Sequence, residues 1–290
     1  MKKLLLVAIL VLGSIYSGTA QTVFLQNFET SATSIPSGWH QQTSSSDPTN
    51  LGWQFDTAYL PINGGLGSYY FTTDGSYFAF VNDLDNNGSR SCNYDTLYTS
   101  FFSTLGYSHL FISLDAEYWD FYESASLLAS NDGGHTWTLI SKLPGNINSW
   151  GHYTYNFDAF ANQANIMIAI TYADNCIQGA GLAIDNILVS VPTYDLDMGV
   201  TNQITNIFVQ NNAPNIIQGT IYNYGGDSIA QMHLNYSIDG GPAVTDAMTS
   251  LSIEPLTSYN FSHSTPWIPS VAGYHTIKIW ADNLNGGNDQ

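Results

Sequence analysis

The sequence contains very few basic residues. Lysine and arginine together number 5, against 23 aspartates and glutamates, which gives a formal net charge of -18 at pH 7. A surface this acidic repels phosphate backbones and anionic lipid headgroups. The composition therefore excludes nucleic acid as a partner, and it favours metal cations that prefer oxygen ligands, such as calcium.

Charged residues of either sign are also scarce. They make up 10% of the chain, whereas 44% is hydrophobic and 14% is aromatic. Disordered chains combine low hydrophobicity with high charge, so this composition indicates a folded protein with a substantial core. A length of 290 residues suggests one large or two ordinary domains.

Long hydrophobic runs are absent after the first 20 residues. Those residues have the pattern of a secretory signal: Lys2 and Lys3, an apolar stretch over 4–12, and small residues up to Ala20. We expect export with cleavage after Ala20 and no transmembrane segment, because no later run approaches the roughly 20 residues needed to span a bilayer. Cleavage would leave three cations against 23 carboxylates, a formal net charge of -20.

Patterns with helical periodicity are nearly absent as well. Short runs rich in Val, Ile, Thr, Tyr and Phe alternate with clusters of Gly, Asn, Asp and Ser, as in β-strands joined by turns. Gly133 and Gly134 after Asp132 indicate a hairpin turn. Strands are predicted over 77–81, 110–114, 126–130, 136–140, 166–172, 182–189, 219–224, 233–238 and 276–280. The sequence predicts an all-β protein.

A domain boundary is predicted near residues 191–194, where Pro192 interrupts the strand pattern. We expect one domain over 21–191 and a second over 195–290. The alternation and length of the second suit an immunoglobulin-like β-sandwich. Residues 282–290 read as the beginning of a further strand or linker, which is consistent with a second domain cut short at Gln290.

Several segments resemble a known family. The segments FLQNFETSATSIPSGWH, FAFVNDLDNNGS, ESASLLASNDGGHTWTLI and GAGLAIDNILVS follow one another between residues 23 and 190. Together they resemble the choice-of-anchor J or cleaved-adhesin family of Bacteroidetes surface proteins, jelly-roll modules distantly similar to eukaryotic MAM domains. The segments GTIYNYGGDSIAQMHLNYSIDGG and AGYHTIKIWADNLN resemble a CARDB-type immunoglobulin-like module.

This resemblance implies a jelly-roll β-sandwich followed by an immunoglobulin-like β-sandwich. It also implies adhesion at a bacterial cell surface with calcium as a structural ion, and no chemistry of its own. Such modules commonly precede a sorting domain for type IX secretion, and the sequence shows no such domain.

One candidate calcium loop lies at Asp83 to Gly88, which spell D-x-D-x-N-G, the opening of an EF-hand loop. The match ends there, because position 12 would be Tyr94 rather than Glu. A partial calcium loop and a solvated turn rich in Asn, Asp and Gly are the two alternatives. The candidate ligands of this stretch are Asn82, Asp83, Asp85 and Asn87.

Two further calcium candidates follow from the resemblance. It implies that Glu29 in NFET and Asp185 in AIDNI lie close together and help to hold the ion. A physical argument supports Asp185, since it lies between Ile184 and Ile187 in an apolar strand, where an unpaired carboxylate would be costly. The alternative is an aspartate that points outward from an edge strand.

Cys92 and Cys176 are the two cysteines of the chain. In an exported protein an even pair predicts a disulfide, and the alternative is two reduced, buried cysteines. Pairing would bring the acidic stretches 83–87 and 174–175 together.

Aromatic residues are dense over 117–123, the segment EYWDFYE. Rings flanked by carboxylates suit stacking on sugars, which makes Tyr118, Trp119 and Tyr122 candidate ligand-binding residues. The alternative is a strand that ends in a loop with half of its rings in the core. Three tryptophans are interpreted as core or strand-packing residues: Trp39, Trp53 and Trp137.

Catalytic signatures are missing. The mature chain contains no H-E-x-x-H, no G-x-S-x-G and no closely spaced histidine pair, so the sequence predicts no enzyme. Asp115, Glu117 and Glu123 in one cleft would suit glycoside hydrolysis, and charged loop residues are the alternative. We expect a secreted or cell-surface, monomeric, non-catalytic adhesin that binds a surface glycan or protein. The alternative is an ancillary region of a secreted protease or glycosidase whose catalytic domain lies outside this chain.

Overall fold

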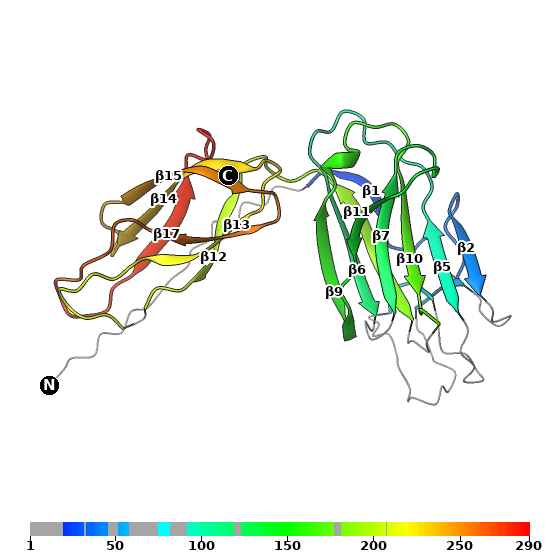
Figure 1. Cartoon of the computed structure of the whole chain (residues 1–290), viewed down its shortest axis with the longest axis horizontal. Helices are drawn as coiled ribbons and strands as arrows, with labels where there is room; N and C mark the ends of the chain where they lie inside the picture. The colour runs from blue at the N-terminus through cyan, green and yellow to red at the C-terminus, as the bar shows by residue number, and fades with distance from the viewer. Residues whose placement is uncertain are drawn as a thin grey trace. The chain divides into compact units, whose positions relative to one another are not determined.

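The computed structural model of the chain is built almost entirely of antiparallel β-strands (Figure 1). It describes residues 20–31, 33–45, 52–57, 75–81, 92–118, 123–176, 181–206 and 208–290. The predicted all-β class is confirmed. None of the helices in these ranges is long and apolar enough to cross a bilayer. The described chain divides into two compact units, residues 21–191 and residues 192–290.

The first unit is a sandwich of two antiparallel sheets, as in a jelly roll. The six-stranded sheet has the order β3-β4-β11-β6-β9, with β1 also paired to β11. Its strands are β1 (Thr22–Gln26), β3 (Trp53–Asp56), β4 (Phe78–Val81), β6 (Phe111–Tyr118), β9 (Asn146–Asn156) and β11 (Leu182–Ser190). The five-stranded sheet has the order β2-β5-β10-β7-β8. Its strands are β2 (His40–Ser45), β5 (Asn93–Tyr98), β7 (Ser124–Ser130), β8 (Thr138–Lys142) and β10 (Met167–Ala173).

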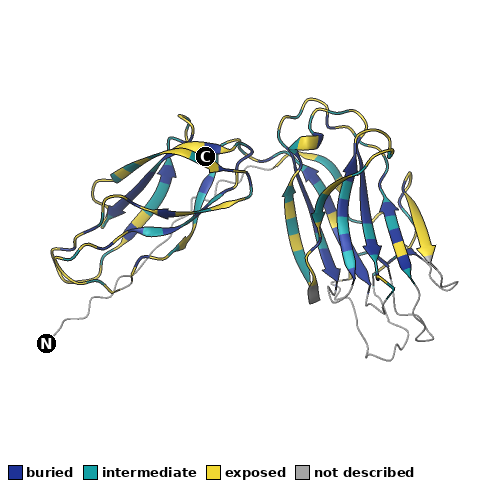
Figure 2. Ribbon diagram, viewed as in Figure 1, coloured by how far each residue is buried: buried dark blue, intermediate teal, exposed yellow. Residues whose placement is uncertain are grey.

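The core of the first unit lies between these two sheets. Strand β7 shows why: Ala125, Leu127 and Ala129 are buried against the other sheet, whereas Ser126 and Leu128 between them point the opposite way. The same alternation sends Leu97 of β5 and Ile112 of β6 into the core. The inner strands β5, β10 and β7 therefore have one face buried inside and one face directed outward, whereas the edge strand β2 is exposed (Figure 2).

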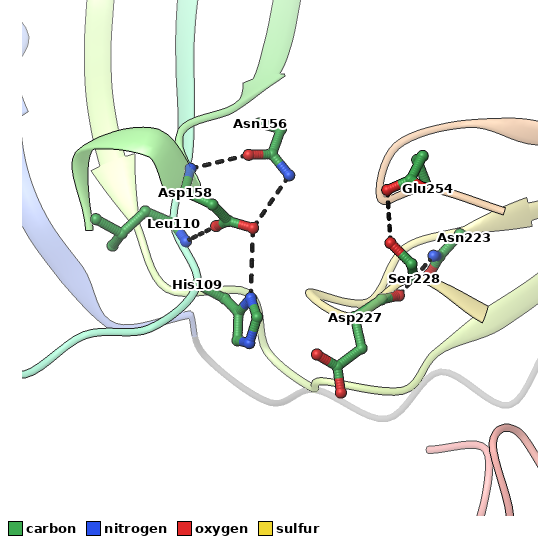
Figure 3. Close-up of polar contacts among 8 residues, drawn as sticks. All are labelled: His109, Leu110, Asn156, Asp158, Asn223, Asp227, Ser228 and Glu254. Carbon is green, nitrogen blue, oxygen red and sulfur yellow. Dashed lines mark hydrogen bonds and ion pairs between the residues drawn. The ribbon is translucent and has the colours of Figure 1, made fainter. Parts of the chain in front are cut away.

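A polar network closes one end of this sandwich (Figure 3). Asp158, in the short 3-10 helix η1 (Asp158–Phe160), accepts hydrogen bonds from the backbone N–H of Leu110 (2.7 Å) and from Asn156 Nδ2 (3.2 Å). His109 Nδ1 lies 3.4 Å from the same carboxylate. Because this carboxylate joins the start of β6 to the end of β9, we assign it a structural role.

The second unit is a sandwich of two three-stranded sheets, ordered β12-β13-β16 and β15-β14-β17. Its strands are β12 (Met198–Gln203), β13 (Gln218–Asn223), β14 (Ile229–Ile238), β15 (Val244–Ile253), β16 (Ser258–Ser262) and β17 (Ile277–Asp282). Ile221, Leu234 and Phe261 fill the space between the sheets. Side chains also fix the turns, since Ser228 Oγ donates to Glu254 Oε2 at 2.5 Å (Figure 3).

Asp289 makes the stability of the second unit depend on pH. Its Oδ1 accepts the backbone N–H of Met198 (2.8 Å). Burial, together with the nearby charge of Asp197, raises the pKa of Asp289 from its ordinary value of 3.8 to about 6. Between these two pH values the folded state holds a proton that the unfolded state has released. The free energy of unfolding therefore falls as pH rises through this window and stays lowered above it.

We expect Asp289→Asn to raise the melting temperature at pH 7, because the amide keeps the acceptor for Met198 and removes the charge. The gain should disappear near pH 4, where wild-type Asp289 is already protonated in the folded state. Thermal unfolding of both proteins between pH 4 and pH 8 measures this. Asp195→Asn, which neutralises an exposed carboxylate of the same unit, is the control. A difference of equal size at both pH values would contradict the assignment.

Candidate ligand-binding face

The outward face of the five-stranded sheet carries the candidate site. Leu97, Ile170 and Leu127 lie opposite one another on β5, β10 and β7, and all three are fully buried in the core. Residues one position away along each strand therefore point outward. With residues of β2, of β8 and of the turn before β8, some of them form two groups, which we call the aromatic row and the polar row. The aromatic row comprises His40, Tyr98 and Trp137, and the polar row comprises Gln42, Thr96, Thr171, Ser126 and Lys142.

The aromatic row consists of three rings in succession. The rings of His40 and Tyr98 are stacked, with centroids 4.5 Å apart and planes 12° apart. Tyr98 then contacts Trp137 at 5.4 Å with an interplanar angle of 49°. Tyr98 is in the middle, so the two end rings, His40 and Trp137, are those best placed to contact a ligand.

Trp137 reaches this row from a distant strand. It precedes β8, whose backbone is three strand spacings, about 14 Å, from that of β5. The ring must therefore extend over the strands between them. Ala169 of β10 lies opposite Tyr98 and is 2% exposed although it points outward. Its small side chain leaves room for the rings above it.

The hairpin before β8 holds Trp137 in place. Trp137 Nε1 donates to the carbonyl of Gly134 (3.1 Å), and Gly134 has a φ of 85°, which a side chain would strain. The carboxylate of Asp132 accepts the hydroxyl of Thr136 (2.6 Å), the backbone N–H of Thr136 (2.9 Å) and the hydroxyl of Ser130 (2.8 Å). These bonds hold the pKa of Asp132 well below its usual range. A ring fixed in this way loses little conformational entropy when it binds a ligand.

The polar row crosses all five strands. Gln42 lies opposite Thr96, Thr96 opposite Thr171, Thr171 opposite Ser126, and Ser126 opposite Lys142. The backbones at its two ends are four strand spacings, about 19 Å, apart. The row is linked to the aromatic row because Tyr98 Oη donates to Gln42 Oε1 (3.3 Å). It offers hydroxyl, amide and ammonium groups along one line.

The five strands of this face carry no exposed carboxylate. Among the residues of the five strands the single acidic one is Asp95, which is 1% exposed and lies on the core side. The face therefore combines aromatic rings with hydrogen-bonding groups and one cation. Such a surface suits a ligand that alternates apolar ring faces with hydroxyl groups.

The aromatic candidates from the sequence lie elsewhere. Tyr118 is 2% exposed and packs in the core, so its ring is not available to a ligand, which corrects its interpretation as a binding residue. Trp119 and Tyr122 lie outside the described residues. Trp137, interpreted as a core or strand-packing residue, packs against Tyr98 on the outward face, as part of the aromatic row. His40 and Tyr98 were not identified from sequence, because only the pairing of β2 with β5 brings them together.

The carboxylates considered for hydrolysis do not form an open cleft. Glu117 on β6 is fully buried, and Glu123, which precedes β7 in the other sheet, is 6% exposed. Asp115 points to the outer side of the six-stranded sheet, where His152 Nδ1 lies 2.7 Å from its Oδ1.

The calcium candidates are only partly described. Asn82, Asp83, Asp85 and Asn87 lie outside the described residues. Glu29 is exposed, and its Oε1 accepts the backbone N–H of Tyr77 (2.8 Å). Asp185 is 6% exposed, and its Oδ1 accepts the backbone N–H of Asn186 (2.7 Å).

Strand β11 changes partners beside Asp185. Ile187 of β11 lies opposite Gln26 of β1, whereas Ile184 lies opposite Ala79 of β4. Glu29 follows β1 and bonds to the residue before β4, so both carboxylates belong to the junction of β1, β4 and β11. Asp185 also lies directly opposite Asp115 of β6. Within the described ranges, no group of three or more His, Cys, Asp and Glu side chains is placed to hold a metal ion.

The two cysteines form a disulfide in the structure. Cys92 precedes β5 and Cys176 follows β10, and their sulfur atoms are 2.05 Å apart. Asp174 reinforces the same place, because its Oδ1 accepts the backbone N–H groups of Asn93 (3.0 Å) and Cys176 (2.7 Å). The disulfide therefore joins two strands that are already adjacent in the sheet.

The chain resembles several solved structures at low sequence identity. No family model matches the chain. No curated protein matches it either. Similar solved structures include the K1 cleaved adhesin domain of Lys-gingipain from Porphyromonas gingivalis, which is 18% identical, covers 59% of this chain and 98% of that chain, and has a TM-score of 0.37.

Two carbohydrate-binding modules are similar at the same level. A CBM22-1 xylan-binding domain from Paenibacillus barcinonensis is 8% identical, with coverage of 60% of this chain and 97% of that chain and a TM-score of 0.34. TmCBM61, solved with β-1,4-galactotriose, is 13% identical, with coverage of 57% and 93% and a TM-score of 0.37.

Proposed function

We propose that this protein is a non-catalytic adhesin that binds a glycan on the outward face of the five-stranded sheet. The observation that carries this proposal is the aromatic row beside the polar row, on strands that carry no exposed carboxylate. Sugars present the same combination, since their rings have apolar C–H faces and hydroxyl groups around the rim.

The aromatic row and the polar row would each contact a different part of a sugar. The rings of His40 and Trp137 would remove the apolar faces of a sugar from water, which is favourable in proportion to the area buried. Gln42, Thr96 and Thr171 would exchange hydrogen bonds with its hydroxyl groups. These side chains are on paired strands and on a hairpin held by hydrogen bonds, so little reorganisation is needed for binding.

We also infer the setting of this activity from the sequence. The segments of residues 23–190 support a cleaved-adhesin-type jelly-roll module, and those of the second unit support a CARDB-type immunoglobulin-like module. The signal pattern at residues 1–20 supports export to the bacterial cell surface, where an acidic protein of this kind would act as a monomer.

A glycan and protein array tests the proposed function. The exported chain, residues 21–290, is applied to immobilised glycans and extracellular-matrix proteins, and bound protein is detected by a C-terminal tag. We expect binding to a subset of glycans. Binding to proteins alone, or to no probe, would contradict the proposal.

We propose in addition that the first unit holds structural calcium near Asp185 and Glu29. Asp185 lies directly opposite Asp115 on the neighbouring strand, and two facing carboxylates concentrate negative charge that would attract a cation. Glu29 belongs to the same junction of strands, and carboxylate oxygens are the ligands that calcium prefers. The D-x-D-x-N-G stretch would supply further oxygen ligands.

Chelation of calcium should lower the melting temperature of the protein. An ion that binds only the folded state adds about 2.7 kcal/mol to the free energy of unfolding at one hundred times its Kd. Differential scanning calorimetry with calcium or with EDTA measures the difference. Magnesium should restore little of it, because it requires tighter octahedral geometry.

Substitution of single carboxylates tests where the calcium ion binds. Asp185→Asn and Glu29→Gln should each remove much of the calcium-dependent shift. Asp132→Asn should keep the full shift, because the carboxylate of Asp132 is bonded within its own hairpin. Identical melting temperatures of the wild type in calcium and in EDTA would refute the proposed site.

A further inference from the structure

The strands of the outward face contain no exposed carboxylate in a chain that has 23 acidic residues. Of the three cations that would remain after signal cleavage, Arg90 lies outside the described residues and Lys278 belongs to the second unit. The third is Lys142, at the β8 end of the polar row, opposite Ser126. The face thus differs in charge from the protein as a whole.

The ammonium group of Lys142 is available to a ligand. Lys142 is exposed and makes no ion pair with any described residue. Its backbone carbonyl accepts the hydroxyl of Ser141 (2.8 Å). Lys278, by contrast, lies 5.1 Å from the centre of the Trp280 ring. No described contact explains the charge of Lys142 as a contribution to folding.

The overall negative charge does not prevent an anion from binding here. Repulsion between exposed charges is screened over about 8 Å at physiological ionic strength, so nearby groups dominate. Among the described residues, the acidic group closest in register is Glu123, which precedes β7 and is 6% exposed, and Asp95 is 1% exposed on the core side of the sheet. Lys142 is therefore the principal charge along the polar row.

We propose that the outward face prefers glycans with an anionic group, a carboxylate or a sulfate, which pairs with Lys142. This inference rests on the proposed function. The glycan lies along the polar row with its ring faces against the aromatic row and its anionic group at the β8 end. The opposite end of the row is the uncharged Gln42, so a glycan with one anionic end would bind in a single orientation.

Matched pairs of probes test this preference. Polygalacturonate is compared with its carboxyl-reduced form, and chondroitin sulfate with its desulfated form, alongside neutral xylan and galactan. Binding of the chain 21–290 to the immobilised polysaccharides is measured by biolayer interferometry in low and in physiological salt. The first pair isolates the carboxylate, and the second isolates the sulfate.

We expect tighter binding to the anionic member of at least one pair. Lys142→Gln should weaken that binding about threefold to fivefold, the effect of an exposed ion pair, and should weaken binding of the neutral member less. Lys142→Arg should retain the preference, and Lys278→Gln, which removes a cation from the second unit, should not affect it. The preference should decrease as salt is added.

The remaining outcomes separate this inference from the proposed function. Equal binding to both members of every pair, unaffected by Lys142→Gln, would overturn the preference and leave glycan binding intact. A preference that survives Lys142→Gln, or that Lys278→Gln also removes, would overturn the role of Lys142. Absence of binding to every polysaccharide, neutral or anionic, would overturn both proposals.

Discussion

Trp137→Ala should weaken glycan binding by at least about 30-fold, the effect of a residue that contributes about 2 kcal/mol to an interface. Trp137 is one of the two end rings of the aromatic row, and the hairpin fixes its orientation. Its removal would take away both the stacking surface and the contact that supports Tyr98. Isothermal titration calorimetry with a glycan identified on the array measures the change.

Two variants serve as comparisons. Trp280→Ala removes a partly exposed tryptophan from the second unit and should leave affinity unchanged. Tyr98→Phe keeps the ring and loses only the hydrogen bond to Gln42, so its effect should be much smaller than that of Trp137→Ala. Circular dichroism and melting temperature establish that each variant is folded. Unaltered affinity in a folded Trp137→Ala protein would remove the aromatic row from the site.

Removal of the disulfide should lower the free energy of unfolding of the first unit more than any other substitution proposed for that unit. The bond between Cys92 and Cys176 closes a loop with a sequence separation of 84 residues. In the chain-entropy model, opening a loop of this length lowers the free energy of unfolding by at most about 4 to 5 kcal/mol. We expect Cys92→Ser/Cys176→Ser to shift the urea midpoint of the first unit strongly downward.

The hydrogen bonds of Asp174 allow a comparison at the same place. Asp174→Asn weakens the acceptor for the backbone N–H groups of Asn93 and Cys176 but leaves the covalent link intact. Its loss of stability should be smaller than that of the double serine variant. Intact mass before and after reduction and alkylation establishes the bond in the wild type. Two free thiols in exported wild-type protein, or an unchanged midpoint in the double variant, would contradict this prediction.

Local patterns predicted much of the fold. Short runs of strand-forming residues between turn clusters identified β7 and β10, which were predicted over 126–130 and 166–172. The glycines after Asp132 identified the hairpin, because they tolerate backbone angles that other residues avoid. These features depend on neighbours in the sequence, so a single sequence is sufficient to find them.

The same reasoning did not identify the binding face. Tyr118 belongs to an aromatic segment that resembles a sugar site, yet it faces the core because β6 alternates in that register. Trp137 looked like a packing residue, and the structure places it over the outward face. Whether a ring points inward or outward depends on which sheet its strand joins, and sequence spacing does not specify this.

The sequence by itself determined the all-β class, the position of the hairpin and the one possible pairing of two cysteines. Each of these follows from composition or from residues close together in the chain. Only the tertiary structure decided that His40, Tyr98 and Trp137 form one row, because the sheet order β2-β5-β10-β7-β8 brings distant strands side by side. That order is set by how the two sheets bury their apolar faces against each other, a property of the whole unit and of no single segment.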